Sequence, residues 1–348
     1  MISYTTESIR NIALTGHGAA GKTTLVESIL YHAGKLAALG AVEKGNTVCD
    51  FDPQEKAHQH SLDAALVNFD YQGAHINLID TPGFTDFIGQ AIAVLPAVET
   101  VALVINAQTG IEAMTQRMME RAAERRQCRM IIINKIDAEN LDLPGLLSQI
   151  QDSFGKECLP INLPANGGAG VVDCFFNPAG DSDFSSVAAA HSALIDQVVE
   201  MDEDLMAVYL EQGDDLQPDQ LHAPFEKALR EGHLIPICFV SARTGAGVKE
   251  LLNIFAKLLP NPLEGNPEPL VKGDGAVIEE FPAIPDPKQH AVAHVFKVLI
   301  DPFIGKLGIF RIHQGSITRD SQLLIGDGRK PFKVNHLFQL HGKEHPEI

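Results

Sequence analysis

The sequence has 348 residues, a formal net charge of −18 and a hydrophobic content of 45%. This length suffices for two or three domains, and the composition is ordinary for a globular protein. No apolar run is long enough to span a bilayer, and the N-terminus has no signal-peptide pattern, so we expect a cytoplasmic protein without a membrane partner. The negative charge counts against nucleic acid as a direct partner, because phosphate contacts need a basic surface.

The five cysteines are scattered along the chain and are never spaced as CxxC: Cys49, Cys128, Cys158, Cys174 and Cys238. An odd number without paired spacing argues against a disulfide framework or a zinc site. The pattern favours a reducing compartment.

In chain order, apolar runs alternate with helical patterns, which is typical of a doubly wound α/β fold. Residues 35–63 are polar and are expected to be irregular. Strands are expected at 11–14, 67–71, 76–79, 101–105, 130–133 and 235–240, and helices at 22–33, 114–126, 143–154 and 248–258.

Three other segments do not fit this alternation. The segment 157–233 is too long for a loop, so we expect it to be an α+β subdomain inserted in a main domain of residues 1–265. Within this subdomain we expect a strand at 171–176 and helices at 187–201, 205–210 and 220–230. Residues 260–287 hold seven prolines, and 266–287 are expected to be a linker. Short strands at 294–300, 307–312, 322–325 and 332–340 predict an incomplete β-barrel in 288–348.

The first motif is a phosphate-binding loop. It reads GHGAAGKT and lies between a predicted strand and a predicted helix, as the pattern G-x-x-x-x-G-K-[ST] requires. Its backbone N–H groups and the helix N-terminus suit phosphate oxygens. Lys22 should contact the β- and γ-phosphates, and the Thr23 hydroxyl should bind Mg²⁺. The nucleotide-binding candidates are Gly16, His17, Gly18, Ala19, Ala20, Gly21, Lys22, Thr23 and Thr24.

The second motif, DTPG, follows the predicted strand at 76–79. By itself, Asp-Thr-Pro-Gly would be an ordinary turn. Together with the phosphate loop it predicts that Asp80 supports the Mg²⁺ shell and that the Gly83 N–H faces the γ-phosphate, with Thr81 and Pro82 between them.

The third and fourth motifs predict a guanine site. Asn134, Lys135 and Asp137 belong to NKID after one strand, and Ser241, Ala242 and Arg243 follow the last strand. An Asp carboxylate can accept from guanine N1–H and the 2-amino group together, whereas adenine would leave it unpaired. We therefore disfavour an ATP-using enzyme. The Ala242 N–H is expected to meet guanine O6.

In this order the motifs resemble those of the translational GTPases, and within them elongation factor G. GHGAAGKTT is similar to the GHVDAGKTT of that family, DTPGF to its DTPGH, and the likeness covers essentially the whole chain, including VSARTGAGVKELLNIFAKLLPNP and DPFIGKLGIFRIHQGSI. The resemblance implies GTP and GDP as substrate and product, Mg²⁺ as cofactor, a ribosome partner and a monomer. Family members continue through three further domains, so an N-terminal fragment is expected.

Three departures resemble a divergent second elongation-factor-G-like branch. Ser61 stands where the family has the Mg²⁺-binding Thr of its switch segment, so the metal candidates are Thr23, Ser61 and Asp80. Ala19 replaces an Asp. Phe84 replaces the His that aligns the attacking water, so the catalytic candidates are Lys22, Gly83 and Phe84 at the place of the His. We expect a GTPase that acts on the ribosome in translocation or recycling and hydrolyses GTP slowly without the ribosome. The alternative is a GTP-dependent binding switch with little turnover.

Overall fold

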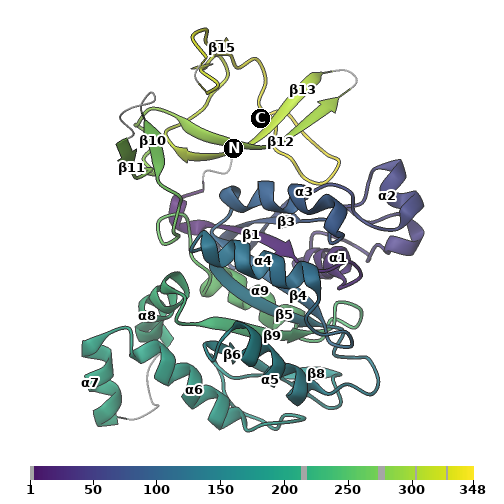
Figure 1. The fold of residues 1–348 in the computed structure, drawn as a ribbon, viewed down its shortest axis with the longest axis vertical. Coiled ribbons are helices and arrows are strands. Elements are labelled where there is room, and N and C mark those ends of the chain that lie inside the picture. The colour runs from purple at the N-terminus through teal and green to yellow at the C-terminus, as the bar shows by residue number, and fades with distance from the viewer. Residues whose placement is uncertain (1–3, 213–217, 273–278, 302–303, 327) are drawn as a thin grey trace.

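The computed structural model describes residues 4–212, 218–272, 279–301, 304–326 and 328–348 (Figure 1). Its largest sheet comprises β1 (Ile9–Thr15), β2 (Ala65–Tyr71), β3 (Ala74–Asp80), β4 (Thr100–Asn106), β5 (Cys128–Asn134), β6 (Cys158–Pro160) and β9 (Ile235–Val240). The strand order is β2-β3-β1-β4-β5-β9-β6. Among these strands β2 alone runs antiparallel to its neighbour, so the carboxyl ends of the other strands meet at one edge. This confirms the predicted doubly wound α/β fold.

Burial explains why the central strands were easy to predict. Every residue of β4 and of β9 is buried, because helices cover the sheet. α1 (Lys22–His32) packs against α9 (Val248–Lys257), and both contact β3. α4 (Ala113–Glu124) packs against β4, β5 and α3 (Ile88–Val94). Strands covered by helices in this way read as continuous apolar runs.

The expectation that residues 35–63 are irregular was wrong in part. They contain a short helix, α2 (Pro53–His58), and a 3₁₀ turn at Val42–Lys44. The Asp52 carboxylate accepts a hydrogen bond from Gln54 N at 2.7 Å, and Glu55 Oε2 accepts one from Asp52 N at 3.2 Å. This reciprocal capping, with Pro53 in the first helical position, starts a helix that has little apolar periodicity.

The segment 157–233 begins within the main sheet, because β6 pairs in parallel with β9. It continues with the hairpin β7 (Asn162–Ala165) and β8 (Gly170–Asp173). The strand expected at 171–176 is therefore shorter and begins one residue earlier. Three helices follow: α6 (Val187–Val199), α7 (Glu203–Gln212) and α8 (Pro218–Glu231). α5 (Leu143–Phe154) precedes the segment, with the predicted bounds.

The C-terminal part consists of small antiparallel pairs. β10 (Leu270–Lys272) pairs with β11 (Glu279–Phe281) within the segment expected to be a linker, of which 273–278 lie outside the described residues. β12 (Val292–Asp301) pairs with β13 (Gly305–Gln314), and β14 (Gln322–Leu323) with β15 (Phe332–Lys333). The strand expected at 332–340 is thus only two residues long.

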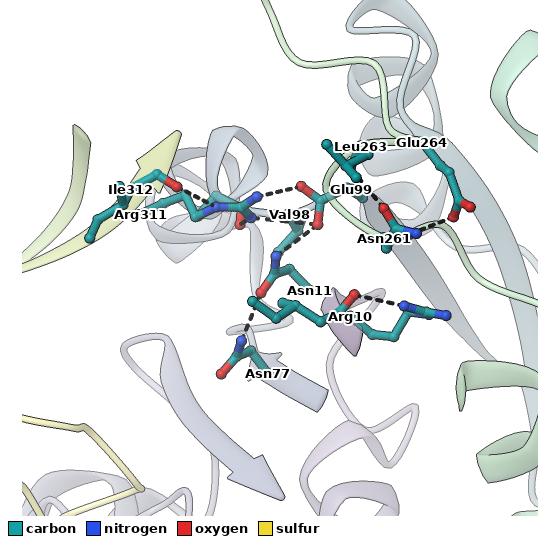
Figure 2. A network of polar contacts seen from close by, with 12 residues as sticks. Arg10, Asn11, Asn77, Val98, Glu99, Asn261, Leu263, Glu264, Arg311 and Ile312 are labelled. Atoms are coloured by element: carbon teal, nitrogen blue, oxygen red, sulfur yellow. Dashed lines mark hydrogen bonds and ion pairs between the residues drawn. The ribbon is translucent and has the colours of Figure 1, made fainter. Parts of the chain in front are cut away.

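A polar network attaches β13 to the main sheet (Figure 2). The guanidinium of Arg311 donates to Glu99 Oε1 at 2.8 Å and to Ala97 O at 2.9 Å. Glu99 Oε2 accepts from Asn11 Nδ2, and Asn11 Oδ1 accepts from Asn77 Nδ2, both at 2.8 Å. Because Asn11 lies on β1 and Asn77 on β3, Arg311 is linked through Glu99 and Asn11 to the strands that lead to the phosphate loop and to Asp80.

Candidate nucleotide site

The phosphate loop lies between β1 and α1. Lys22 Nζ donates to Gly16 O and to His17 O, both at 2.9 Å, so the loop curls around the ammonium group. Gly16 has φ +135°, and a Cβ there would lie 2.3 Å from Val104 O, so the turn requires glycine. Burial lowers the pKa of Lys22 to about 8, although the carboxylates of Asp80 and Asp50 oppose the shift. A buried ammonium of this kind is suited to an anionic ligand.

The three residues expected to bind the metal lie together. Thr23 Oγ1 donates to Asp80 Oδ2 at 2.6 Å and lies 3.2 Å from Ser61 Oγ. Ser61 Oγ in turn donates to Asp50 Oδ1 at 2.8 Å. Asp80 Oδ1 and Asp50 Oδ2 are buried and have no hydrogen-bond partner among the described residues. Hydroxyl and carboxylate oxygens are ligands that Mg²⁺ accepts, so these residues fit the ion.

The charges of this cluster also suit a cation. Burial, together with the nearby Asp50 carboxylate, raises the pKa of Asp80 to about 7. Burial likewise raises the pKa of Asp50, although the hydrogen bond from Ser61 opposes the shift. A divalent ion would offset the cost of holding two carboxylates in a buried position. The part of the chain that the structure describes contains no cluster of three or more His, Cys, Asp or Glu side chains for a metal, so a site here would depend on the two hydroxyls.

Asp50 was not among the predicted site residues. It begins the polar stretch that contains Ser61, in which the family resemblance implies a metal ligand at the Ser61 hydroxyl alone. Its side chain is buried because the segment folds back over α1: Glu27 on α1 accepts backbone hydrogen bonds from Gly40 and Val48. The one signal in the sequence is an Asp in the stretch VCDFDP, which is weak.

The predicted base-reading residues meet at the ends of β5 and β9. Asn134 Nδ2 donates to Ala20 O at 2.9 Å, which ties this loop to the phosphate loop as expected. Asn134 Oδ1 accepts from Ala242 N at 3.0 Å. Ser241 Oγ donates to Asp137 Oδ1 at 2.6 Å. Two motifs that lie about a hundred residues apart therefore form one surface.

Arg243 and Lys135 border this surface. Arg243 forms an ion pair with Asp137 Oδ2, although most of the arginine side chain is exposed. Burial acts to raise the pKa of Asp137, but hydrogen bonds from Ser241 and Arg243 outweigh it and the pKa is lowered. The carboxylate therefore stays ionised and can only accept hydrogen bonds, which is what binding to guanine N1–H and the 2-amino group requires. Lys135 Nζ donates to Ala19 O at 2.8 Å, so its stem reaches from the base-reading loop to the phosphate loop.

The DTPGF segment lies directly on the phosphate loop. Thr81 Oγ1 donates to Leu14 O at 2.8 Å, and Thr81 and Pro82 are buried. A Cβ at Gly83 would lie 2.4 Å from Lys22 Nζ and 2.7 Å from Gly18 N, so only glycine permits this approach. The Phe84 ring lies over Gly18, where a Cβ would lie 3.1 Å from the ring. The Phe84 ring also contacts the His60 ring, with centroids 4.6 Å apart.

Comparisons with known proteins agree with this geometry. Residues 7–261 match the elongation factor Tu GTP binding domain family. The chain is 32% identical over 330 residues to the elongation factor G-like proteins of two Mycobacterium tuberculosis strains, CDC 1551 / Oshkosh and H37Rv, and covers 46% of each. These alignments cover 91% of the chain.

A crystal structure of a Thermus thermophilus protein superposes on 98% of the chain and 50% of that protein, with a TM-score of 0.81 and 29% identity. The chain therefore spans about half the length of the relatives that it matches. Both the sequence motifs and the arrangement of the strands are those of one family. The chain belongs to the elongation factor G family of translational GTPases.

Proposed function

We propose that this chain is the GTP-binding part of a factor that hydrolyses GTP on the ribosome, in translocation or recycling. The convergence of four separate motifs at one edge of the sheet supports the proposal. Thr23 contacts Asp80 from the neighbouring strand, and Asn134 contacts both the phosphate loop and Ala242. The roles predicted for these residues, and the division into nucleotide domain, insertion, linker and barrel, are part of the proposal.

In the proposed mechanism the chain binds and orients the nucleotide. Lys22 and the Gly83 N–H stabilise negative charge on the γ-phosphate, and Asp137 selects guanine. Thr23, Ser61, Asp80 and Asp50 would hold Mg²⁺, which when bound neutralises charge between the β- and γ-phosphates. Phe84 cannot accept or donate a proton, so it can pack against the loop but cannot orient water.

That limitation supports a second candidate, a GTP-dependent switch with very little turnover. The Phe84 ring occupies the position over Gly18. Positioned proton-handling groups contribute about 10²–10⁴-fold to rates, so their absence predicts slow hydrolysis without the ribosome. The two candidates differ in whether the ribosome restores the rate.

Single-turnover GTP hydrolysis by the full-length protein, with and without ribosomes, tests both. Strong ribosomal stimulation supports the GTPase, whereas GTP-dependent ribosome binding without stimulation supports the switch. Absence of ribosome binding in either nucleotide state contradicts both.

No helix among the described residues has the length and apolar character needed to cross a membrane. We propose a monomer in the cytoplasm that acts without a membrane partner. Sedimentation of the GDP-bound chain tests the monomeric state.

A further inference from the structure

A cavity of about 430 Å³ lies away from the nucleotide site. It is bordered by the end of α4, the start of β5, and the turn between α8 and β9. The residues that line it include Arg126, Arg129, Arg230, Glu231, His233 and Asn266. β5 and β9 begin at this cavity and end at the base-reading loops. A seven-residue strand is on the order of 20 Å long, so the two sites are well separated.

Three arginines face one cavity in a chain whose net charge is −18. Arg230 pairs with Glu226 at 3.3 Å, and the cavity's own carboxylate, Glu231, lies 3.9 Å from His233. Within the described part of the chain, Arg126 and Arg129 have no carboxylate partner; the Arg129 side chain donates a long hydrogen bond to the Met119 sulfur, at 4.0 Å. Two guanidinium groups are therefore available to a ligand.

The walls of the cavity are held in place by specific contacts. Asn266 Nδ2 donates to Arg126 O and to Arg230 O, both at 2.7 Å, and so joins the two arginine-bearing turns. Arg126 has φ +54°, a left-handed conformation that is unusual for arginine. Gly232 has φ +77°, and a Cβ there would lie 2.9 Å from a terminal nitrogen of Arg129. Glycine thus makes room for the Arg129 guanidinium.

We propose that this cavity binds a small molecule through its phosphate groups. Guanidinium groups match phosphate oxygens with paired hydrogen bonds, and several anionic oxygens are needed to satisfy two unpaired arginines. The volume falls within the range of small-molecule sites. Among the residues that the structure describes, no Phe, Tyr or Trp lines the cavity, so it lacks the stacking surface of single-stranded RNA sites.

Calorimetry on the chain saturated with GDP and Mg²⁺ tests the proposal, because the nucleotide site is then filled. Inorganic phosphate and fructose 1,6-bisphosphate are the two probes, and they distinguish free phosphate from a phosphorylated metabolite. We expect one saturable site, with the bisphosphate binding more tightly. A chain that binds GDP but neither probe would contradict this inference and leave the proposed function intact.

Arg126→Gln and Arg129→Gln should each weaken the binding about tenfold or more, since a hydrogen bond to a charged group is lost. Arg121→Gln is the matched control, because this exposed arginine of α4 lies outside the cavity and pairs with Glu124. If the Arg129→Gln variant does not fold, the Arg126→Gln variant alone tests the proposal, because the Arg126 side chain is exposed. Equal weakening by the control, or saturable binding of a short RNA with no binding of the bisphosphate, would overturn the inference.

Discussion

Arg311 on β13 donates to Glu99 Oε1 at 2.8 Å, and the two side chains are only 16% and 11% exposed. Glu99 also accepts from Asn11 on β1. This ion pair therefore joins the C-terminal hairpin to the strand that leads into the phosphate loop.

Arg311→Leu should loosen the hairpin, because Glu99 would remain nearly buried without its charge partner. We expect a cost on the order of 2 kcal/mol, typical of hydrogen bonds to a charged group. Hydrogen exchange should become faster in β12 and β13 and stay slow in β4 and β5. Arg319→Leu, a change at an exposed arginine of the same region, is the control. Unchanged exchange in the hairpin would show that the ion pair does not hold it.

The hairpin should also respond to pH through His313. Burial and, to a smaller extent, the positive charge of Arg311 lower the pKa of His313 to about 4. The folded hairpin thus favours the neutral ring, so its contribution to stability is complete above about pH 6.5 and is lost as the pH falls toward 4. An NMR titration of the His313 ring measures this directly. A pKa near 6.5 in the native protein would contradict the prediction.

Asp137→Asn should exchange guanine selectivity for xanthine selectivity, because an amide can donate to the carbonyl at position 2. Calorimetry should show GTP affinity falling by about 10⁴-fold and XTP becoming the preferred nucleotide. The unchanged chain should bind ATP far more weakly than GTP. If ATP bound within about tenfold of GTP, Asp137 would not be the base reader.

Asp50→Asn should affect the chain differently with and without Mg²⁺. Without the ion, removal of one charge near the buried Asp80 should raise the melting temperature and lower the pKa of Asp80, which Asp50 now raises. With GDP, the affinity for Mg²⁺ should fall about tenfold or more, as for changes around metal ligands. Glu43→Gln, in an exposed turn, is the control. Equal Mg²⁺ affinity in the Asp50→Asn and Glu43→Gln variants would show that Asp50 does not contribute to Mg²⁺ binding.

Phe84→His tests the catalytic position in the full-length protein. Ribosome-stimulated turnover should rise by about 10²–10⁴-fold if the ring reaches the attacking water, while GDP affinity barely changes. Single-turnover hydrolysis is the measurement. A flat or lower rate would place the catalytic group elsewhere, among His17, His58 and His60; of these, His60 contacts Phe84.

The parts of the fold that could be predicted are those in which local pattern and burial agree. The runs at 130–133 and 235–240 read as covered strands, and they lie within β5 and β9. The alternating residues in 332–340 were misleading. After β15 the chain crosses to β2, where Leu340 O accepts from Asn68 Nδ2 at 2.7 Å and Gly342 N donates to Leu66 O at 2.7 Å. Contacts with so distant a partner leave no periodicity to detect.

The residues of the nucleotide site likewise divide into those that could be predicted from the sequence and those that could not. Thr23, Asp80 and Asn134 could be placed because each follows a strand whose carboxyl end meets the others at one edge of the sheet. Asp50 could not be placed, since its burial depends on a polar segment that has no strand or helix of its own there. The arginine cavity was also missed, because its lining residues come from the α4–β5 connection, the α8–β9 turn and the segment around Asn266, which only the folded chain brings together.

The contact between Gly18 and Phe84 couples two sequence positions. The family patterns GHVDAGKT and DTPGH, which this chain resembles, have Val and His there, whereas here the smaller residue lies against the larger ring. A Cβ at position 18 would lie 3.1 Å from the ring, so a larger side chain there requires Phe84 to move by a few tenths of an ångström. The cost of Gly18→Val should therefore depend on residue 84, and it should be smaller beside His than beside Phe.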